Sequence, residues 1–161
     1  ETSMYPWQRC ILNYVSQPVT PMDYRHIIWI WDRVGGGGKT RLAKHIVFHK
    51  LGKFLTYGKA ADLLNLVSKF PNENCYIFNL TKARPTSLGY DELYNAIESV
   101  KDGFFINTKY ETAQVIMDIP HIVVFANEQP VQEAMAANRF CIYKLHDGDL
   151  THHSGSNPLM L

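Results

Sequence analysis

The chain has 161 residues, of which 46% are hydrophobic and 19% charged, and its formal net charge is +1. This balance is typical of one globular domain, excludes a disordered chain, and gives no general signal for polyanion binding. No apolar run approaches the roughly 20 residues that span a bilayer, and the first residues do not form a signal peptide. We therefore expect a soluble intracellular protein with no membrane partner, and its start at Glu1 rather than Met predicts a piece of a longer protein.

The hydrophobic pattern predicts strands and helices that alternate along the chain. Residues 6–17 begin with a proline and carry apolar residues on one face, which predicts a helix. Residues 26–31, 75–80 and 121–127 are apolar on both faces, as in strands buried inside a sheet. The other predicted elements are strands at 53–58, within 103–119 and at 139–145, and helices at 39–51, 59–70, 89–101 and 131–137.

This alternation predicts an α/β fold, a three-layer domain with a central, mostly parallel sheet. We expect three parts along the chain. Residues 1–25 form an N-terminal helical segment that serves oligomerisation or acts as a linker. Residues 26–146 form the α/β domain, and residues 147–161 form a flexible tail.

A run of four glycines followed by Lys-Thr joins the first buried strand to the next helix. Such a turn lets backbone N–H groups converge on phosphate oxygens, and the start of the helix adds partial positive charge. A lysine at this place reaches the outer phosphates, and a threonine hydroxyl binds Mg²⁺. The alternative is a flexible glycine loop with a chance Lys-Thr. The predicted nucleotide-binding residues are Gly35, Gly36, Gly37, Gly38, Lys39, Thr40 and Arg41.

Polar side chains also end two of the buried strands. Nucleotide hydrolysis with Mg²⁺ normally needs a carboxylate at the end of a neighbouring strand, and the matching position holds the neutral amide Asn79. With Thr40, it is the predicted metal-binding position. Asn127 ends the third strand, where it is placed to orient water or touch a phosphate, or simply to cap the strand.

Together, "GGGGKT", "IFNL", "FINTKYE", "VVFAN" and "NRF" occur in the order and spacing of superfamily 3 helicases. The chain most resembles the helicase domain of replication-initiator (Rep) proteins of small circular single-stranded DNA viruses, of the nanovirus and alphasatellite type. The resemblance runs from about residue 6 to 145. It implies an AAA+-like P-loop ATPase over 26–146 that binds ATP, Mg²⁺ and single-stranded DNA. It also implies a homo-oligomeric ring, often a hexamer, acting in the host nucleus.

The resemblance also assigns roles to single residues. The glycines, Lys39 and Thr40 correspond to the Walker A motif, and Asn79 to the Walker B carboxylate. Asn127 corresponds to the sensor asparagine. Lys109 is similar to a DNA-contacting lysine, and Arg139 to an arginine finger that reaches a neighbour's nucleotide. Lys39, Asn79, Asn127 and Arg139 are thus the predicted catalytic residues.

Three departures from the family pattern bear on ATP turnover. Asn79 and Asn138 each replace an aspartate, and Asp32 stands where relatives have glycine, a position from which its charge opposes phosphate. One interpretation is an active helicase that uses another carboxylate, such as Asp91 or Glu92. The second is a module that binds nucleotide and DNA and oligomerises but hydrolyses little. A third class is a small-molecule P-loop kinase. Such a kinase needs an arginine-rich lid and an acceptor site, and the sequence shows neither.

Charge and side-chain spacing give weaker signals. Residues 33–61 hold seven basic residues and no acidic one, whereas 111–138 hold four acidic residues and no Lys or Arg. This asymmetry suits an anionic ligand near the first stretch or facing surfaces between neighbours in a ring, and the alternative is two solvated faces. His45 and His49 are four apart, as in metal pairs, but an exposed helix face is the favoured interpretation. Two interpretations are open for Lys82 and Arg84: they line a DNA channel, or they are simply solvated. The three tryptophans are predicted to be core residues: Trp7, Trp29 and Trp31.

Overall fold

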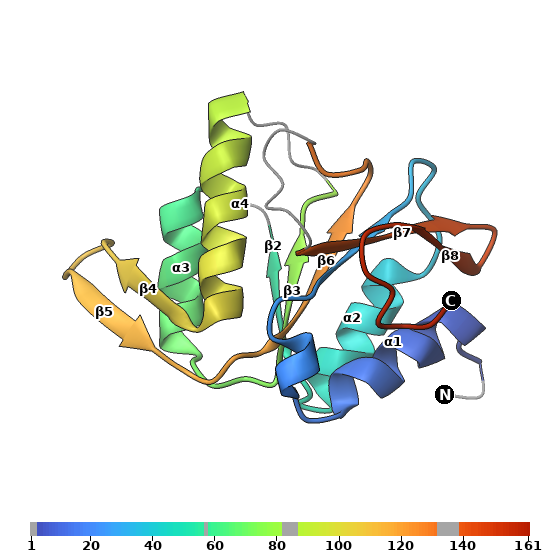
Figure 1. The fold of residues 1–161 in the computed structure, drawn as a ribbon, viewed down its shortest axis with the longest axis horizontal. Coiled ribbons are helices and arrows are strands. Elements are labelled where there is room, and N and C mark those ends of the chain that lie inside the picture. The colour runs from blue at the N-terminus through green and yellow to red at the C-terminus, as the bar shows by residue number, and fades with distance from the viewer. Residues whose placement is uncertain (1–2, 57, 82–86, 132–138) are drawn as a thin grey trace.

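A computed structural model describes residues 3–56, 58–81, 87–131 and 139–161. It is an α/β fold with a central six-stranded sheet in the order β2-β3-β6-β1-β7-β8, as predicted (Figure 1). Five of these strands run parallel, and β8 is antiparallel to β7. The strands of this sheet are β1 (Ile27–Trp31), β2 (Lys53–Thr56), β3 (Cys75–Asn79), β6 (His121–Ala126), β7 (Phe140–His146) and β8 (Asp149–Ser154).

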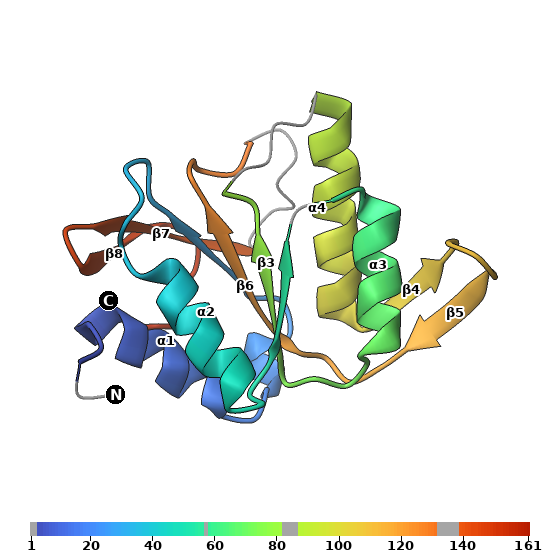
Figure 2. The same ribbon diagram turned by 180° about the vertical axis from the view of Figure 1, so that it is seen from behind.

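Helices cover both faces of the sheet and make two separate cores. Figure 2 shows helices α1 and α2 on one face and α3 and α4 on the other. Alternate residues of β1 enter the two cores, since Ile28 and Ile30 face α1 and α2 whereas Trp29 and Trp31 face α3 and α4. The helices are α1 (Pro6–Ser16), α2 (Lys39–Phe48), α3 (Ala60–Lys69) and α4 (Ser87–Asp102), with a short 3₁₀ turn, η1 (Pro21–Asp23).

The N-terminal helix shares a core with the sheet. In α1, the residues Trp7, Ile11 and Val15 recur at helical spacing and are almost completely buried. They belong to the same hydrophobic cluster as Ile28 of β1 and Leu42 of α2. Because this cluster is continuous, the segment before residue 26 packs as part of the α/β domain. The predicted burial of Trp7, Trp29 and Trp31 is confirmed.

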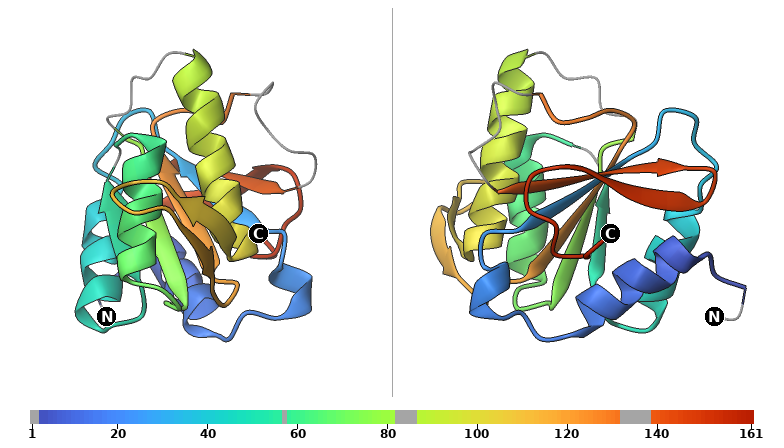
Figure 3. Two further views of the ribbon diagram at one scale, coloured as in Figure 1. Left: turned by 90° about the vertical axis from the view of Figure 1, so that its left-hand side faces the viewer. Right: turned by 45° about the vertical axis from the view of Figure 1, so that its right-hand side comes forward.

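The C-terminal segment differs from the flexible tail predicted for residues 147–161. Strand β8 pairs with β7 and ends the sheet, as Figure 3 shows. The turn between them is Asp147-Gly148, whose φ angles of 51° and 79° are both positive. Asp-Gly with this backbone is a strong signal for a two-residue hairpin. The prediction was wrong because it was based on the polar composition of the segment and did not take the Asp-Gly turn into account. Leu150 and Leu159 of this segment are buried.

A separate hairpin projects beside α3 and α4 (Figure 1). It consists of β4 (Phe104–Asn107) and β5 (Ala113–Ile116), paired antiparallel, within the segment 103–119 where the sequence predicted strands. The predicted helix at 131–137 and the side chains of Lys82 and Arg84 lie outside the described residues. No helix in the described part of the chain combines the length and apolar character that crossing a membrane requires.

Lys101, in the last turn of α4, is a fully buried cation. Its Nζ donates to the Pro120 carbonyl at 2.8 Å, and burial lowers its pKa to about 8. In the unfolded chain the lysine keeps its usual pKa near 10.4, so the unfolded state binds more protons between these two values. Stability therefore rises with pH through this range as the buried ammonium loses its charge.

Lys101→Met is expected to remove this pH dependence. Between pH 8 and 9, the unfolding free energy of the unchanged chain should rise by about 1 kcal/mol relative to the variant. Urea titrations at half-unit pH steps measure the difference. Cys75 and Cys141, whose pKa values burial raises to about 12, act in the opposite direction, but they are present in both chains and so cancel in the comparison. Parallel stability curves for the two chains would contradict the prediction.

Candidate nucleotide site

The glycine loop joins the end of β1 to the first turn of α2. Three glycines of the loop, Gly35, Gly36 and Gly38, have positive φ angles, the backbone region that favours glycine. Gly38, the residue that caps α2, has φ of 92°. At Gly37, a Cβ atom would lie 2.6 Å from Cδ2 of Leu145 and 3.0 Å from Oδ2 of Asp32, so a side chain there would require these two neighbours to shift. The glycine run is therefore required by geometry, which does not fit a merely flexible loop.

The N-terminal helix fixes the orientation of this loop. Trp7 donates its Nε1–H to the Gly37 carbonyl at 3.1 Å, and Gln8 donates its Nε2–H to the Gly38 carbonyl at 2.8 Å. Both carbonyls are thus held by α1. No side chain of the described residues caps the start of α2, so the N–H groups of its first turn remain available to an anion.

Lys39 is a buried cation at the base of the loop. Only 8% of the residue is exposed, and its Nζ has no hydrogen-bond partner among the described residues. The nearest charge is Oδ2 of Asp32, at 3.7 Å, which is an ion-pair distance too long for a hydrogen bond. Burial lowers the pKa of Lys39, and the Asp32 carboxylate opposes that shift. A buried ammonium that lacks hydrogen bonds favours an additional anion.

Asp32 holds the first half of the loop. Its Oδ1 accepts hydrogen bonds from the backbone N–H groups of Val34 and Gly35, at 3.0 and 3.2 Å. This carboxylate therefore occupies two loop amides and also pairs with Lys39. This geometry fits the expectation that Asp32 opposes phosphate.

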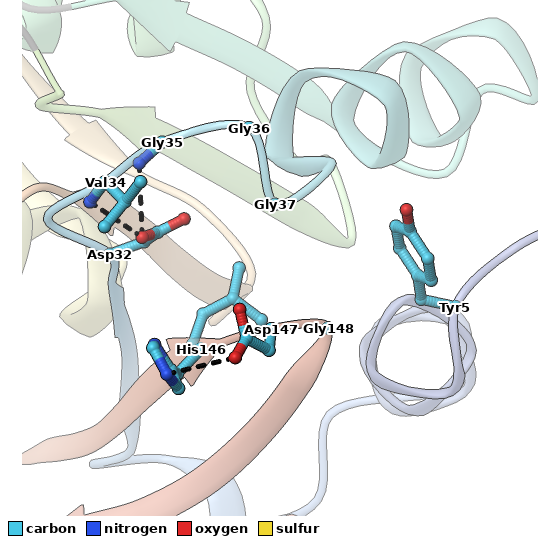
Figure 4. Close-up of a pocket in the computed structure, with 10 residues that line it drawn as sticks. Tyr5, Asp32, Val34, Gly35, Gly36, Gly37, His146, Asp147 and Gly148 are labelled. Atoms are coloured by element: carbon cyan, nitrogen blue, oxygen red, sulfur yellow. Dashed lines mark hydrogen bonds and ion pairs between the residues drawn. The ribbon is translucent and has the colours of Figure 1, made fainter.

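A cavity of about 230 Å³ opens beside the loop (Figure 4). The glycine loop forms one wall. The β7–β8 turn, with His146, Asp147 and Gly148, lies opposite, and Tyr5 lies at the end of the cavity next to α1. Three segments far apart in the sequence thus meet around one space.

The two strand-ending amides lie at the same edge of the sheet as the loop. The Asp32 N–H donates to the Ala126 carbonyl at 3.1 Å, so Asn127 follows directly on the strand next to the loop. Asn127 donates Nδ2–H to the Thr81 carbonyl. Asn79 accepts from the Thr81 hydroxyl at 2.9 Å. Thr81 therefore links the two amides.

The two residues predicted to bind Mg²⁺, Thr40 and Asn79, carry no negative charge. Thr40 lies in the first turn of α2 and is exposed, and its hydroxyl makes no side-chain hydrogen bond within the described residues. The Asn79 oxygen is neutral and already accepts a hydrogen bond from Thr81. The described residues include no cluster of three or more acidic, His or Cys ligands. These residues suit a metal that is held mainly by phosphate oxygens and waters, as Mg²⁺ often is.

Arg139 and Lys109 lie away from the loop. Arg139 directly precedes β7, at the amino end of the parallel strands, and only 5% of it is exposed. Its guanidinium pairs with Asp102 at 2.8 Å and with Glu98 at 3.6 Å. In the β4–β5 hairpin, Lys109 pairs with Asp62 of α3. The roles predicted for Arg139 and Lys109 both require these ion pairs to open.

No family model matches the chain, but individual relatives do. It is 32% identical over 79% of its length to the Para-Rep C3 protein of Milk vetch dwarf C3 alphasatellite. It is 28% identical over 86% of its length to the master replication protein of Banana bunchy top virus. A further relative is Para-Rep C6 of Subterranean clover stunt C6 alphasatellite, at 32% over 78%.

The chain is a homologue of nanovirus and alphasatellite Rep proteins. This confirms the resemblance that the sequence motifs indicated. The chain spans less than half the length of these relatives, from 42% to 44% of each.

Several residues around the loop were not predicted from the sequence. Tyr5 and Gln8 lie in a segment interpreted only as a helix, and pattern alone gave no signal that they touch the loop. The Asp147-Gly148 turn had a readable signal, because Asp-Gly between two runs of strand-like residues is typical of a hairpin. Of the weaker signals, the His45 and His49 rings contact each other at 4.3 Å between centroids.

Proposed function

We propose that this chain is the ATP-binding helicase part of a viral Rep protein that initiates DNA replication. One observation carries the proposal: the buried Lys39 ammonium has no hydrogen-bond partner in the described chain, and it lies below a glycine loop and an uncapped helix start. A polyphosphate supplies the anion that both features lack. The names of the relatives, master replication protein and Para-Rep, support a role in replication.

In this proposal each described residue has a limited task. The N–H groups at the start of α2 and the Lys39 ammonium bind the phosphates, and the Thr40 hydroxyl helps to hold Mg²⁺, which supplies charge neutralisation during phosphoryl transfer. Asn127 orients water near the outer phosphate. Single-stranded DNA binds at Lys109, and ring assembly in the host nucleus completes the helicase.

A second candidate is a nucleotide-binding and assembly module with little hydrolysis. It is favoured by the Asn79 amide, which carries no charge and is occupied by Thr81. This candidate keeps the phosphate site and loses only turnover.

Phosphate release from ATP, with and without single-stranded DNA, separates the two functions. We expect Asn79→Asp to raise the turnover rate at least tenfold, because a carboxylate at the end of β3 strengthens metal binding near the reacting phosphate. Asn13→Asp, on an exposed position of α1, introduces the same charge and serves as the control. Lys39→Met is the blank.

Each result assigns the function. Release by the unchanged chain that is lost in the blank means that another carboxylate serves, and the helicase proposal stands. Release only after Asn79→Asp supports the binding module. Absence of release from all variants refutes ATP hydrolysis as the activity.

A further inference from the structure

Asp32 is a buried carboxylate enclosed by the glycine loop. The residue directly follows β1, and only 6% of it is exposed. Its Oδ1 accepts hydrogen bonds from the Val34 and Gly35 N–H groups at 3.0 and 3.2 Å (Figure 4). Its Oδ2 lies 3.7 Å from Nζ of Lys39 and 3.0 Å from the place where a Cβ of Gly37 would be. The loop therefore curves around this carboxylate.

An anion enclosed in this way makes the contacts that a phosphate would make. A phosphate at a glycine loop accepts hydrogen bonds from backbone N–H groups and pairs with the lysine at the start of the following helix. The Asp32 carboxylate is also an anion that only accepts hydrogen bonds, and it has the same two kinds of partner. Each backbone amide has a single N–H, and two anions repel each other at close range. The carboxylate and a phosphate therefore exclude each other from the centre of the loop.

The cavity beside the loop gives the carboxylate a second position. Asp32 lines this cavity of about 230 Å³, and Tyr5 and His146 lie on its other walls (Figure 4). A change of side-chain rotamer moves the carboxylate toward this space while the backbone N–H of Asp32 stays bonded to the Ala126 carbonyl at 3.1 Å. The movement costs the two charge-assisted hydrogen bonds from the loop amides, and this cost lowers the affinity for an external anion.

We infer that Asp32 is an autoinhibitory residue, an internal competitor whose carboxylate occupies the centre of the loop and has to leave before a polyphosphate binds. The inference rests on the proposed nucleotide site and adds how access to that site is controlled. The group that opens the loop is a polyphosphate, which replaces the carboxylate on the same amides and the same lysine.

Competition for the amides differs from simple charge repulsion in its response to two substitutions. Asp32→Asn removes the charge but keeps a side-chain oxygen that accepts from the Val34 and Gly35 N–H groups. Asp32→Ala removes both the charge and the acceptor. Competition therefore predicts a larger gain in phosphate affinity for alanine than for asparagine, whereas repulsion alone predicts equal gains.

The first test is calorimetry with inorganic tripolyphosphate and Mg²⁺, because this probe carries phosphate groups and nothing else. We expect Asp32→Ala to bind it about tenfold more tightly than the unchanged chain, or better, and Asp32→Asn about threefold more tightly. The control is Asp118→Ala. Asp118 is exposed and lies shortly before β6, at the opposite edge of the sheet from the loop, so its loss should change the affinity by less than about twofold.

The second test is amide hydrogen exchange of Val34 and Gly35, measured by NMR on the chain without added tripolyphosphate. Both amides should exchange several-fold faster in Asp32→Ala than in the unchanged chain, because they lose their acceptor. In Asp32→Asn they should stay protected. Exchange that is the same in all three chains overturns the inference, since the carboxylate would then not hold these amides.

The affinities separate failure of the inference from failure of the proposed function. Equal binding by Asp32→Ala and the unchanged chain overturns the inference and leaves the phosphate site intact. Equal gains in Asp32→Ala and Asp32→Asn also overturn it, because charge alone would then explain the effect, and so does weaker binding by Asp32→Ala. Binding by Asp32→Ala but not by the unchanged chain supports the inference. Absence of binding in every chain overturns the proposed function, and the inference with it.

Discussion

Replacing Arg139 by methionine is expected to lower the free energy of unfolding by about 3 kcal/mol, the cost typical of breaking a buried ion pair. The guanidinium is almost completely buried between Glu98 and Asp102 of α4, and its backbone carbonyl accepts from the Ile27 N–H at 2.8 Å. Arg139 therefore fastens the start of β7 to both β1 and α4. Its removal leaves the partly buried Glu98 carboxylate without its cation.

The loss of stability should depend on pH. Burial raises the pKa of Glu98, and Arg139 opposes this shift, so removing the arginine raises the pKa further. A carboxyl whose pKa is higher in the folded state takes up a proton on folding as the pH falls, and the cost of the unpaired charge then disappears. The difference between variant and unchanged chain should thus shrink from pH 7 towards pH 4.

Urea unfolding at several pH values measures this effect, with Arg9→Met as the control. Arg9 is exposed on α1, so its replacement removes the same charge with little effect on stability. An Arg139→Met chain as stable as the control at pH 7 would refute the structural role.

Arg139 illustrates how far the sequence determines this fold. The strands β1, β3 and β6 were predictable because their apolar residues face both layers, and helices between them require parallel pairing. The motif "NRF" located Arg139 in the chain. It did not reveal Glu98 and Asp102, which lie about 40 residues earlier and meet the arginine only after α4 packs on the sheet.

Some residues of the candidate site were likewise predictable from the sequence, and others were not. Gly38 and Lys39 were predictable because the loop joins a buried strand to a helix, a local feature of the chain. Tyr5, Leu145 and Asp147 were not, since they reach the loop from α1 and from β7 at separations of more than 25 residues. The missed β8 has another cause: its alternate side chains are polar because an edge strand faces water on one side.

Replacing Lys39 by methionine is expected to lower the affinity for ATP and for tripolyphosphate at least tenfold, because a charge-assisted hydrogen bond to phosphate is lost. Stability should change little. The ammonium is buried, its pKa is lowered by that burial, and it makes no hydrogen bond in the described structure. The desolvation cost that methionine removes therefore offsets the lost attraction to Asp32.

A loss of affinity without a loss of stability distinguishes a side chain that binds the ligand from one that only supports the fold. The matched control is Lys44→Met. Lys44 lies on the exposed face of the same helix, so its replacement makes the same chemical change away from the loop. Thermal unfolding and calorimetry on the two variants give both readouts. We expect similar melting temperatures and a large difference in affinity.

If Lys39→Met unfolds at a much lower temperature, the ion pair with Asp32 is a structural element, and the weaker binding would follow from loss of the loop. If affinity is retained, Lys39 does not contact the phosphates and the site lies elsewhere.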